Sequence, residues 1–592
     1  MPVAHRMAFW RDPLMRHDLA LIVIMGVLAA CGLIYEYLLS HYAGRILGAV
    51  EATIYAMIGV MIVSMGIGAF YARYIRCPFS GFAWLEVGIG LLGAVCVLIM
   101  AAVFAAAYIL PAQLQTVYGL DPTIQVAGGV VTGFRRFADT MPFVAGFALG
   151  LMVGMEIPLI ARVRQALHQE HLEHNAGTIY GADYIGAGIG AAIWVLVCLR
   201  LPIIVAAVST ASVNLLMGMV FLWRYQRYIH TRAVLWLVHA VVLALVAVIA
   251  VQGSNWMLSL NNMLFKDRVV HTRITPHQYL TVTERRVGAG LPLVQSLYIN
   301  GHLQFASNDE QIYHALLTYP PLLASARRDR VLIIGGGDGL ALRDVLRWQP
   351  RAVTLLELDR EMIDLFSGRD PTAAPELSAK LLQLNQKALL DSRVEVLIGD
   401  AFLQTERLVA EGRRFDTIIV DLPDPSHPDL NKLYSDYFYS KLGEILAGDG
   451  AVAIQSTSPY HSKKAFVAIG KTLQSAGFTT EQYHTNVPSF GEWGWSIGVK
   501  TGAPASERIA RSTGLPVAHP WVSRQQLLAA FVFAPNYYER RDAVKVNTLG
   551  SHVVYAYHRD AWRKRDGVFF SSEVFHRDAF NSENFSNNVE AR

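Results

Sequence analysis

Apolar residues dominate the first part of the chain, and a pattern typical of soluble proteins replaces them after about residue 252. Seven apolar stretches each approach the roughly 20 residues that an α-helix needs to cross the core of a bilayer. They lie at about 19–41, 52–72, 82–110, 142–161, 180–199, 201–223 and 233–252. Several contain runs of small residues, which let helices pack closely in lipid. The pattern therefore predicts a membrane domain of about seven helices.

Polar and apolar residues alternate in the next part of the chain, over His277–Arg286 and Leu293–Ala306. Alternation with a period of two predicts antiparallel strands. The pair Asn300-Gly301 is typical of a tight hairpin turn and would divide the second stretch into two strands. We therefore expect a small antiparallel β domain directly after the membrane domain.

Short continuous apolar runs follow, and helical stretches separate them. The runs are Val331–Ile334, a second ending in Glu357, Arg393–Ile398, Phe415–Val420 and Ala451–Gln455. Strands that alternate with helices predict a mostly parallel, Rossmann-like sheet of the methyltransferase type, covered by helices on both faces. The expected order is a membrane domain (1–252), an amphipathic interfacial linker (253–265), the β domain (266–320), the Rossmann-like domain (321–505) and a C-terminal extension (506–592).

A glycine cluster comes directly after the first of these runs. Its members are Gly335, Gly336, Gly337 and Gly339, with Asp338 among them. Such a cluster can be a simple tight turn, or it can let the backbone approach a ligand closely. Glu357 ends the second strand about 20 residues on, where an acid accepts hydrogen bonds from ribose hydroxyls. The strand, the helix and this acid together favour a nucleoside site.

Further acids also end predicted strands, namely Asp400, Asp421 and Asp424. Ligands on parallel sheets bind at the carboxyl ends of strands, so these acids and the glycine cluster are expected to share one site. The soluble part has no cysteine and no histidine cluster with metal-ligand spacing, although Mg²⁺ is a rival ligand for carboxylates. Aromatic residues interleave with the acids, and this combination suits ammonium and sulfonium groups. The site therefore favours organic cations and no metal.

The net charge and the positions of the cysteines narrow the possible classes of protein further. The formal net charge is +4, too small to argue for nucleic acid. All four cysteines lie in the membrane half, so no disulfide is expected in the soluble half. The first apolar stretch is long enough to span a bilayer and has no cleavage pattern after it, so no cleavable signal peptide is expected.

Four acids fall inside the predicted spans: Glu36, Glu86, Glu156 and Asp183. Some can lie near an interface or cap a neighbouring helix. Alternatively they form an acidic cavity for a cation, for example a polyamine. Arginines lie in alternate connections, and with seven spans the positive-inside rule would leave the C-terminal half outside the cell. The sequence does not resolve this conflict.

Motifs over about 270–500 resemble those of the spermidine synthases, the polyamine aminopropyltransferases. In family order they are ITPHQYLTV, INGHLQFASNDEQIYHALLTYP, VLIIGGGDGLALRDVL, LLELD, VEVLIGDAF, FDTIIVDLPDP and LYSDYFY. The variants DLPDPSHPDLNKLYS and NVPSFGEWGW, together with the membrane half, resemble the bacterial membrane-integrated branch. Departures from the soluble members occur at Asn300, Leu340, Leu422-Pro423 and Ser426-His427-Pro428, and most of them flank the acceptor side.

The resemblance implies a reaction and a role for each matching residue. Decarboxylated S-adenosylmethionine would be the co-substrate, with no further cofactor, and a diamine, putrescine first, would accept the aminopropyl group. The donor-binding residues would be Gln278, Gly335, Gly337, Asp338, Glu357, Asp400 and Ala401. His314 and Asp424 would line the acceptor site, and Asp421, with Tyr313, would take the proton from the attacking amine.

Two other functions share parts of these patterns. A methyltransferase that uses S-adenosylmethionine has the same sheet and glycine loop, but the acids at Asp421 and Asp424 and the β domain argue against it. A polyamine transporter or sensor with a non-catalytic nucleoside domain would use the intramembrane acids. The resemblance further implies a dimer or larger assembly. The cytoplasmic origin of the donor places the catalytic half in the cytoplasm, at a bacterial inner membrane.

Overall fold

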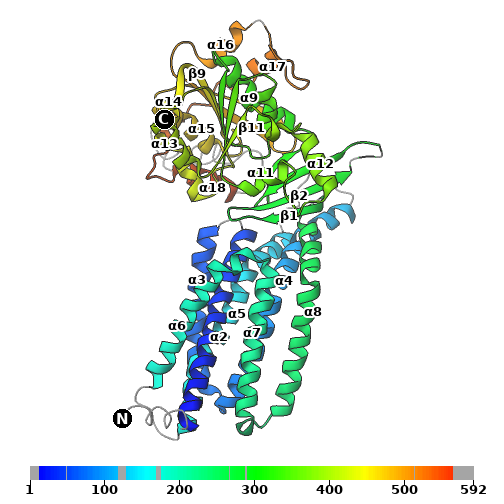
Figure 1. Ribbon diagram of the computed structural model, residues 1–592, viewed down its shortest axis with the longest axis vertical. Coiled ribbons are helices and arrows are strands. Elements are labelled where there is room, and N and C mark those ends of the chain that lie inside the picture. Colours follow the sequence, from blue (N-terminus) through cyan, green and yellow to red (C-terminus); the bar gives the residue numbers. More distant parts are fainter. Residues whose placement is uncertain are drawn as a thin grey trace, which may run out of the picture. The chain divides into compact units, whose positions relative to one another are not determined.

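The computed structural model describes residues 13–47, 50–117, 129–168, 175–265, 267–286, 288, 290–512 and 514–563. Contacts divide the chain into two units, with the boundary between Val269 and Val270 in the sequence. We call them the helical unit and the α/β unit, and Figure 1 shows the elements of each. The last part of the predicted C-terminal extension lies outside the described residues.

The helical unit contains seven long helices among its described residues. They are α2 (Pro13–Leu47), α3 (Val50–Tyr71), α4 (Pro78–Val117), α5 (Gly129–His168), α6 (Asn175–Leu196), α7 (Ile203–Tyr225) and α8 (Arg232–Leu264). Each is long and apolar enough to cross a membrane, which confirms the seven candidate spans by length and composition. Helix α8 continues to Leu264, through most of the residues that we expected to form an interfacial linker.

Small residues set the closest helix contacts of this unit. A Cβ atom at Gly68 of α3 would overlap the backbone oxygen of Leu151 in α5, and one at Gly186 of α6 would overlap that of Gly26 in α2. Only glycine lets these backbones approach so closely. The small-residue runs of the sequence therefore lie at helix–helix contacts.

The α/β unit begins with a four-stranded sheet in the order β1-β2-β3-β4. Its strands are β1 (Arg268–Ile274), β2 (Tyr279–Arg286), β3 (Leu293–Ile299) and β4 (His302–Ala306). Asn300 and Gly301 have φ angles of 50° and 84°, the left-handed pair that a tight hairpin requires. The small antiparallel sheet and its turn were predicted, whereas β1 was not.

A seven-stranded sheet follows in the order β10-β11-β9-β8-β5-β6-β7. Its strands are β5 (Arg330–Gly335), β6 (Ala352–Glu357), β7 (Val394–Ile398), β8 (Phe415–Asp421), β9 (Leu446–Gln455), β10 (Thr479–Val487) and β11 (Gly491–Val499). The first five are parallel, as predicted, and the hairpin β10–β11 joins β9 antiparallel. The Rossmann-like α/β class is confirmed, and the hairpin is an addition to it.

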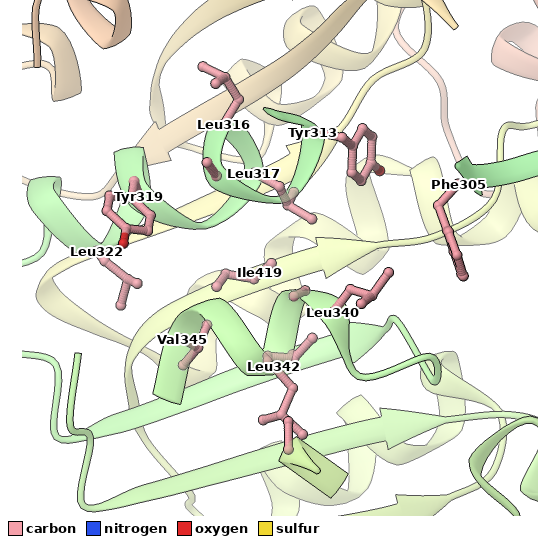
Figure 2. Close-up of a cluster of buried hydrophobic side chains, with 14 of the residues drawn as sticks. Phe305, Tyr313, Leu316, Leu317, Tyr319, Leu322, Leu340, Leu342, Val345 and Ile419 are labelled. Carbon is pink, nitrogen blue, oxygen red and sulfur yellow. The ribbon is translucent and has the colours of Figure 1, made fainter. Parts of the chain in front are cut away.

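Helices cover both faces of this sheet. They are α9 (Glu310–Ala324), α10 (Leu340–Leu346), α11 (Arg360–Phe366), α12 (Pro375–Leu384), α13 (Ala401–Ala410), α14 (Asp436–Ile445), α15 (Lys463–Ser475), α16 (Ala505–Arg511), α17 (Arg524–Ala529) and α18 (Val553–Arg563). Ile419 of β8 points into the buried cluster with α9 and α10 (Figure 2), whereas its neighbours Ile418 and Val420 belong to the cluster on the opposite face. Burial on both faces explains why these strands are continuous apolar runs.

The strand order reverses between β5 and β8, which pair directly. In open parallel sheets, ligands bind outside the carboxyl ends of the strands at such a reversal. Gly335 pairs with Asp421 in the register of these two strands. The fold therefore brings the glycine cluster and the acids that follow β8 to one place.

Candidate active site

The glycine loop after β5 lies between two acids from neighbouring strands. Gly335 has a φ angle of 81°, and a Cβ atom there would overlap the backbone oxygen of Asp421. A Cβ atom at Gly337 would lie 2.7 Å from Oε2 of Glu357. The loop therefore needs glycine for its conformation and for its closeness to both strand ends.

Asp338 and Glu357 are buried beside this loop, each with 8% of its surface exposed. Oδ1 of Asp338 accepts a hydrogen bond from the Leu340 amide at 2.9 Å, and Oε1 of Glu357 accepts one from the Asp359 amide at 3.0 Å. Burial raises the pKa of Asp338 to about 6 and that of Glu357 to about 7. Both groups would gain from a bound cation that offsets this desolvation.

Asp421 ends β8 and is hydrogen-bonded to a tyrosine of α9. The hydroxyl of Tyr313 donates to Oδ1 of Asp421 at 2.8 Å. Oδ2 faces the glycine loop, since a Cβ atom at Gly336 would lie 3.1 Å from it. Burial raises the pKa of Asp421, while the charge of His314 and the Tyr313 hydrogen bond oppose the shift. One oxygen is thus held and the other faces the loop.

Aromatic rings surround Tyr313. Its ring lies 5.5 Å from that of Trp495 and 5.9 Å from that of Phe490, measured between centroids. Trp495 is fully buried in β11. The aromatic side of the site, expected from the interleaved tyrosines and tryptophans, is therefore built largely by the hairpin that the sequence analysis missed.

Asp424 is held by three side chains that the sequence analysis did not identify. Nε2 of Gln455 donates to Oδ1 at 2.6 Å, Oγ1 of Thr457 donates to Oδ2 at 3.3 Å, and Nε2 of His558 lies 3.2 Å from Oδ2. Burial disfavours the carboxylate, but these hydrogen bonds and the charge of His558 outweigh it and lower the pKa of Asp424. Thr457 has a φ angle of 60°, a strained conformation of the kind that gathers at functional sites.

A buried ionic network supports the site from α9 and α10. We call it the Glu310 network; it consists of Glu310, His314, Arg343 and Asp344. Arg343 binds both oxygens of Glu310 at 2.8 and 3.0 Å, and Nδ1 of His314 lies 2.8 Å from Oε2 of the same carboxylate. Burial opposes the imidazolium, but the hydrogen bond and charge of Glu310, with the charges of Asp338 and Asp421, raise the pKa of His314 to about 9.

The remaining predicted residues are Asp400 and Ala401, which follow β7, and Gln278 of the four-stranded sheet domain. Asp400 caps α13 by accepting from the Phe402 amide at 2.9 Å, and Nζ of Lys432 lies 2.6 Å from its Oδ2. Ala401 is the first residue of that helix and is buried. Gln278 lies just before β2, where its amide donates to Oγ1 of Thr275 at 2.9 Å. For these three residues, the roles that the family resemblance implies stay predictions.

The sequence of this chain is similar to those of known proteins. Residues 310–509 match the spermine/spermidine synthase domain. A polyamine aminopropyltransferase of Shewanella oneidensis is 54% identical over 551 residues, which cover 93% of this chain and 96% of that protein. The chain belongs to the polyamine aminopropyltransferase family. It is an enzyme of the aminopropyltransferase class, as the motifs predicted.

Other proteins similar to this aminopropyltransferase belong to the same family by name. Polyamine aminopropyltransferase 1 of Streptomyces coelicolor is 33% identical over 550 residues, covering 92% of this chain and 94% of that protein. Both alignments are too long to be confined to the α/β unit, so they include the helical unit. The solved spermidine synthase of Thermotoga maritima is 21% identical, covers 47% of this chain and 88% of that chain, and has a TM-score of 0.37. The comparisons do not favour a methyltransferase, a transporter or a sensor.

Proposed function

We propose that this aminopropyltransferase moves the aminopropyl group of decarboxylated S-adenosylmethionine to putrescine, giving spermidine and methylthioadenosine. The observation that carries the proposal is the set of carboxylates around the glycine loop: Asp338, Glu357, Asp421 and Asp424. They line the carboxyl ends of adjacent strands beside aromatic rings. Carboxylates and aromatic faces together suit two organic cations, a sulfonium donor and an ammonium acceptor.

The donor would lie along the glycine loop. Glu357 would bind the ribose hydroxyls, Asp400 the adenine, and the backbone at Gly335, Gly337 and Ala401 would pack against the nucleoside. Asp338 and Asp421 would hold the ammonium end of the aminopropyl group, and Gln278 would lie near the sulfur. Because the sulfonium is already a good leaving group, its departure needs no acid.

The acceptor amine has to lose a proton before it can attack. An alkylamine has a pKa near that of lysine, ~10.4, and is mostly protonated at neutral pH. Oδ2 of Asp421 would accept this proton while Tyr313 fixes Oδ1. The amine nitrogen then forms a bond to the aminopropyl carbon as the carbon–sulfur bond breaks. Holding both cations in line supplies much of the remaining acceleration, up to ~7–11 kcal/mol.

The far end of the acceptor would meet Asp424 and His314. Hydrogen bonds from Gln455 and Thr457 keep the Asp424 carboxylate charged and oriented. The distance from Asp421 to this carboxylate would then set the preferred length of the amine. The departures at Leu422-Pro423 and Ser426-His427-Pro428 lie on this side, so they would tune the choice between diamines.

The experiment that tests this function is an activity assay on the detergent-purified full-length chain. Decarboxylated S-adenosylmethionine is supplied with putrescine, cadaverine or spermidine, and methylthioadenosine is followed. We expect release that depends on the amine and is fastest with putrescine. Faster release with another amine would replace putrescine as the acceptor. Donor binding without release for any amine would overturn the catalytic proposal.

Donor binding should depend on pH between about 6 and 7. A raised pKa means that Asp338 and Glu357 hold protons that ordinary carboxyls would have lost. The donor needs both groups ionised, Asp338 to hold its ammonium group and Glu357 to accept hydrogen bonds from its ribose, so donor affinity should fall as the pH falls through 7 and then 6. Calorimetric titration of the donor at several pH values measures this. Glu357→Gln should remove the upper step and keep the lower, and an affinity independent of pH over this range would contradict the prediction.

The proposal extends to location and assembly. The helical unit would lie in the bacterial inner membrane with the α/β unit in the cytoplasm, where the donor is made. The catalytic unit would assemble as a homodimer or larger. Protease accessibility of the α/β unit in inside-out vesicles, and the mass of the detergent-solubilised particle, test the two statements.

A further inference from the structure

One group of buried polar side chains in the helical unit draws its five members from five different helices. They are Tyr35 (α2), Glu86 (α4), Glu156 (α5), Asn214 (α7) and His239 (α8), and none has more than 1% of its surface exposed. We call them the buried polar cluster. The proposed aminopropyl transfer uses none of them, because every residue of that site lies in the α/β unit.

A hydrogen-bonded asparagine and a glycine of α7 lie beside Glu86, and the glycine also lies beside His239 of α8. Nδ2 of Asn214 donates to Oε2 of Glu86 at 3.1 Å and to its backbone oxygen at 3.0 Å. A Cβ atom at Gly218 would lie 2.9 Å from Cβ of Glu86 and 3.1 Å from Nε2 of His239. Glycine at this point therefore lets Nε2 of His239 approach the Glu86 side chain.

Glu156 lies on α5, which packs against α4. A Cβ atom at Gly88 of α4 would overlap Cε of Met152 in α5, one turn before Glu156, so the turns that carry Glu86 and Glu156 lie side by side. A Cβ atom at Gly93 would lie 2.6 Å from the hydroxyl oxygen of Tyr35. Glu86 and Glu156 thus lie on facing turns, and Tyr35 contacts α4 about two turns further along that helix.

Most of the polar atoms in this cluster lack a hydrogen-bond partner among the described residues. The unpartnered acceptors are Oε1 of Glu86, both carboxylate oxygens of Glu156 and Oδ1 of Asn214. The hydroxyl of Tyr35 and Nε2 of His239 are unpartnered as well. Buried polar atoms are normally paired, and an exception calls for an explanation.

Apart from His239, whose Nδ1 lies 2.9 Å from the backbone oxygen of Leu235, no basic side chain in the described part of the helical unit is paired with these two acids. Ion pairs among the described residues of this unit join Asp18 to Arg164 and to His168. The first lysine of the chain is Lys266, after the last span. Two buried acids without a counter-charge are costly unless a ligand supplies positive charge and hydrogen-bond donors.

We propose that the buried polar cluster binds the terminal ammonium group of an aliphatic amine. A primary ammonium has three N–H donors, and the three unpartnered carboxylate oxygens of Glu86 and Glu156 can accept them. A divalent ion wants six or more oxygens, and no group of His, Cys, Asp or Glu in the described residues is arranged to hold a metal.

This site goes beyond aminopropyl transfer, because it would give the helical unit an amine-binding function of its own. The structure also separates Glu36 from Glu156, although both are acids inside the predicted spans. Glu36 is only half-buried and has no atom among the buried unpartnered ones. It therefore serves as a matched control for the same chemical change in the same unit.

The test is equilibrium binding of radiolabelled spermidine to the full-length chain in lipid nanodiscs. We expect Glu156→Gln, and separately Glu86→Gln, to lose one binding equivalent per chain, while Glu36→Gln keeps it. Release of methylthioadenosine should stay unchanged in all three variants, which shows that they are folded and separates this site from the catalytic one. Glu156→Asp should retain the equivalent with weaker affinity.

Three results would overturn the proposal. The number of spermidine molecules bound per chain could be the same in Glu156→Gln, in Glu86→Gln and in the parent chain. Sodium ions at the same concentration as spermidine could displace the spermidine bound at the cluster completely, which would make the cluster a metal-cation site. Spermidine could fail to bind outside the catalytic unit while the cluster takes up protons, which would make it a proton site.

Discussion

Asp421→Asn is expected to lower kcat by about 10²–10⁴-fold, the usual contribution of a general base. The amide cannot accept the proton of the attacking amine, although it can still accept the Tyr313 hydrogen bond that now reaches Oδ1 at 2.8 Å. Donor affinity should fall much less, because Asp338 and Glu357 remain in place. Single-turnover kinetics with saturating donor, together with donor titration, separate the two quantities.

Asp424→Asn is the matched control for that variant. It makes the same change three residues away, at a carboxylate held by Gln455, Thr457 and His558. We expect a higher KM for the amine and a much smaller change in kcat. Near-normal kcat in Asp421→Asn would remove Asp421 from the base role, and equal losses in both variants would show that the two acids act only by holding substrate.

Arg343→Met is expected to destabilise the α/β unit by about 3–5 kcal/mol, the usual cost of removing one partner of a buried ion pair. Arg343 and Glu310 have 4% and 1% of their surfaces exposed, and the pair is bidentate. Without the guanidinium, Glu310 keeps only His314 as a charged partner and Asp344 loses its closest one. Amide hydrogen exchange in peptides from α9 and α10 reports this loss without requiring the helical unit to unfold.

Arg407→Met provides the comparison. Arg407 and Glu411 form an exposed pair on α13, with 67% and 41% of their side-chain surfaces accessible. Exposed pairs contribute about 0–1 kcal/mol, so exchange in this variant should stay near that of the parent chain. If Arg343→Met changed exchange no more than Arg407→Met, the Glu310 network would not be the support that its geometry indicates.

Much of the site could be predicted because it follows from strand order. Gly335, Glu357 and Asp421 each end a parallel strand, and the carboxyl ends of neighbouring strands meet at one edge. A continuous apolar run followed by glycine or an acid was enough to place them. The hairpin β10–β11 was missed because Thr479–Val487 mixes polar and apolar residues without a clean alternation.

The partners of these acids could not be predicted, because tertiary contacts bring them in from afar. His558 reaches Asp424 across 134 positions of sequence, and nothing around it in α18 distinguishes it from an ordinary helical histidine. Arg343 pairs with Glu310 across 33 positions, and by itself it looks like a surface residue of an amphipathic helix. Gln455 ends a predicted strand, so its position gave a signal that the sequence analysis did not use.

The contact between His558 and Asp424 also has a consequence during synthesis of the chain. A ribosome makes α18 after every other described element, so a growing chain carries the glycine loop and the acids of β5, β6 and β8 long before it can anchor Asp424. Such a nascent chain could sequester the nucleoside donor but would hold the second substrate poorly. The proposed acceptor site is therefore completed only after α18 has been synthesised and has folded against Asp424.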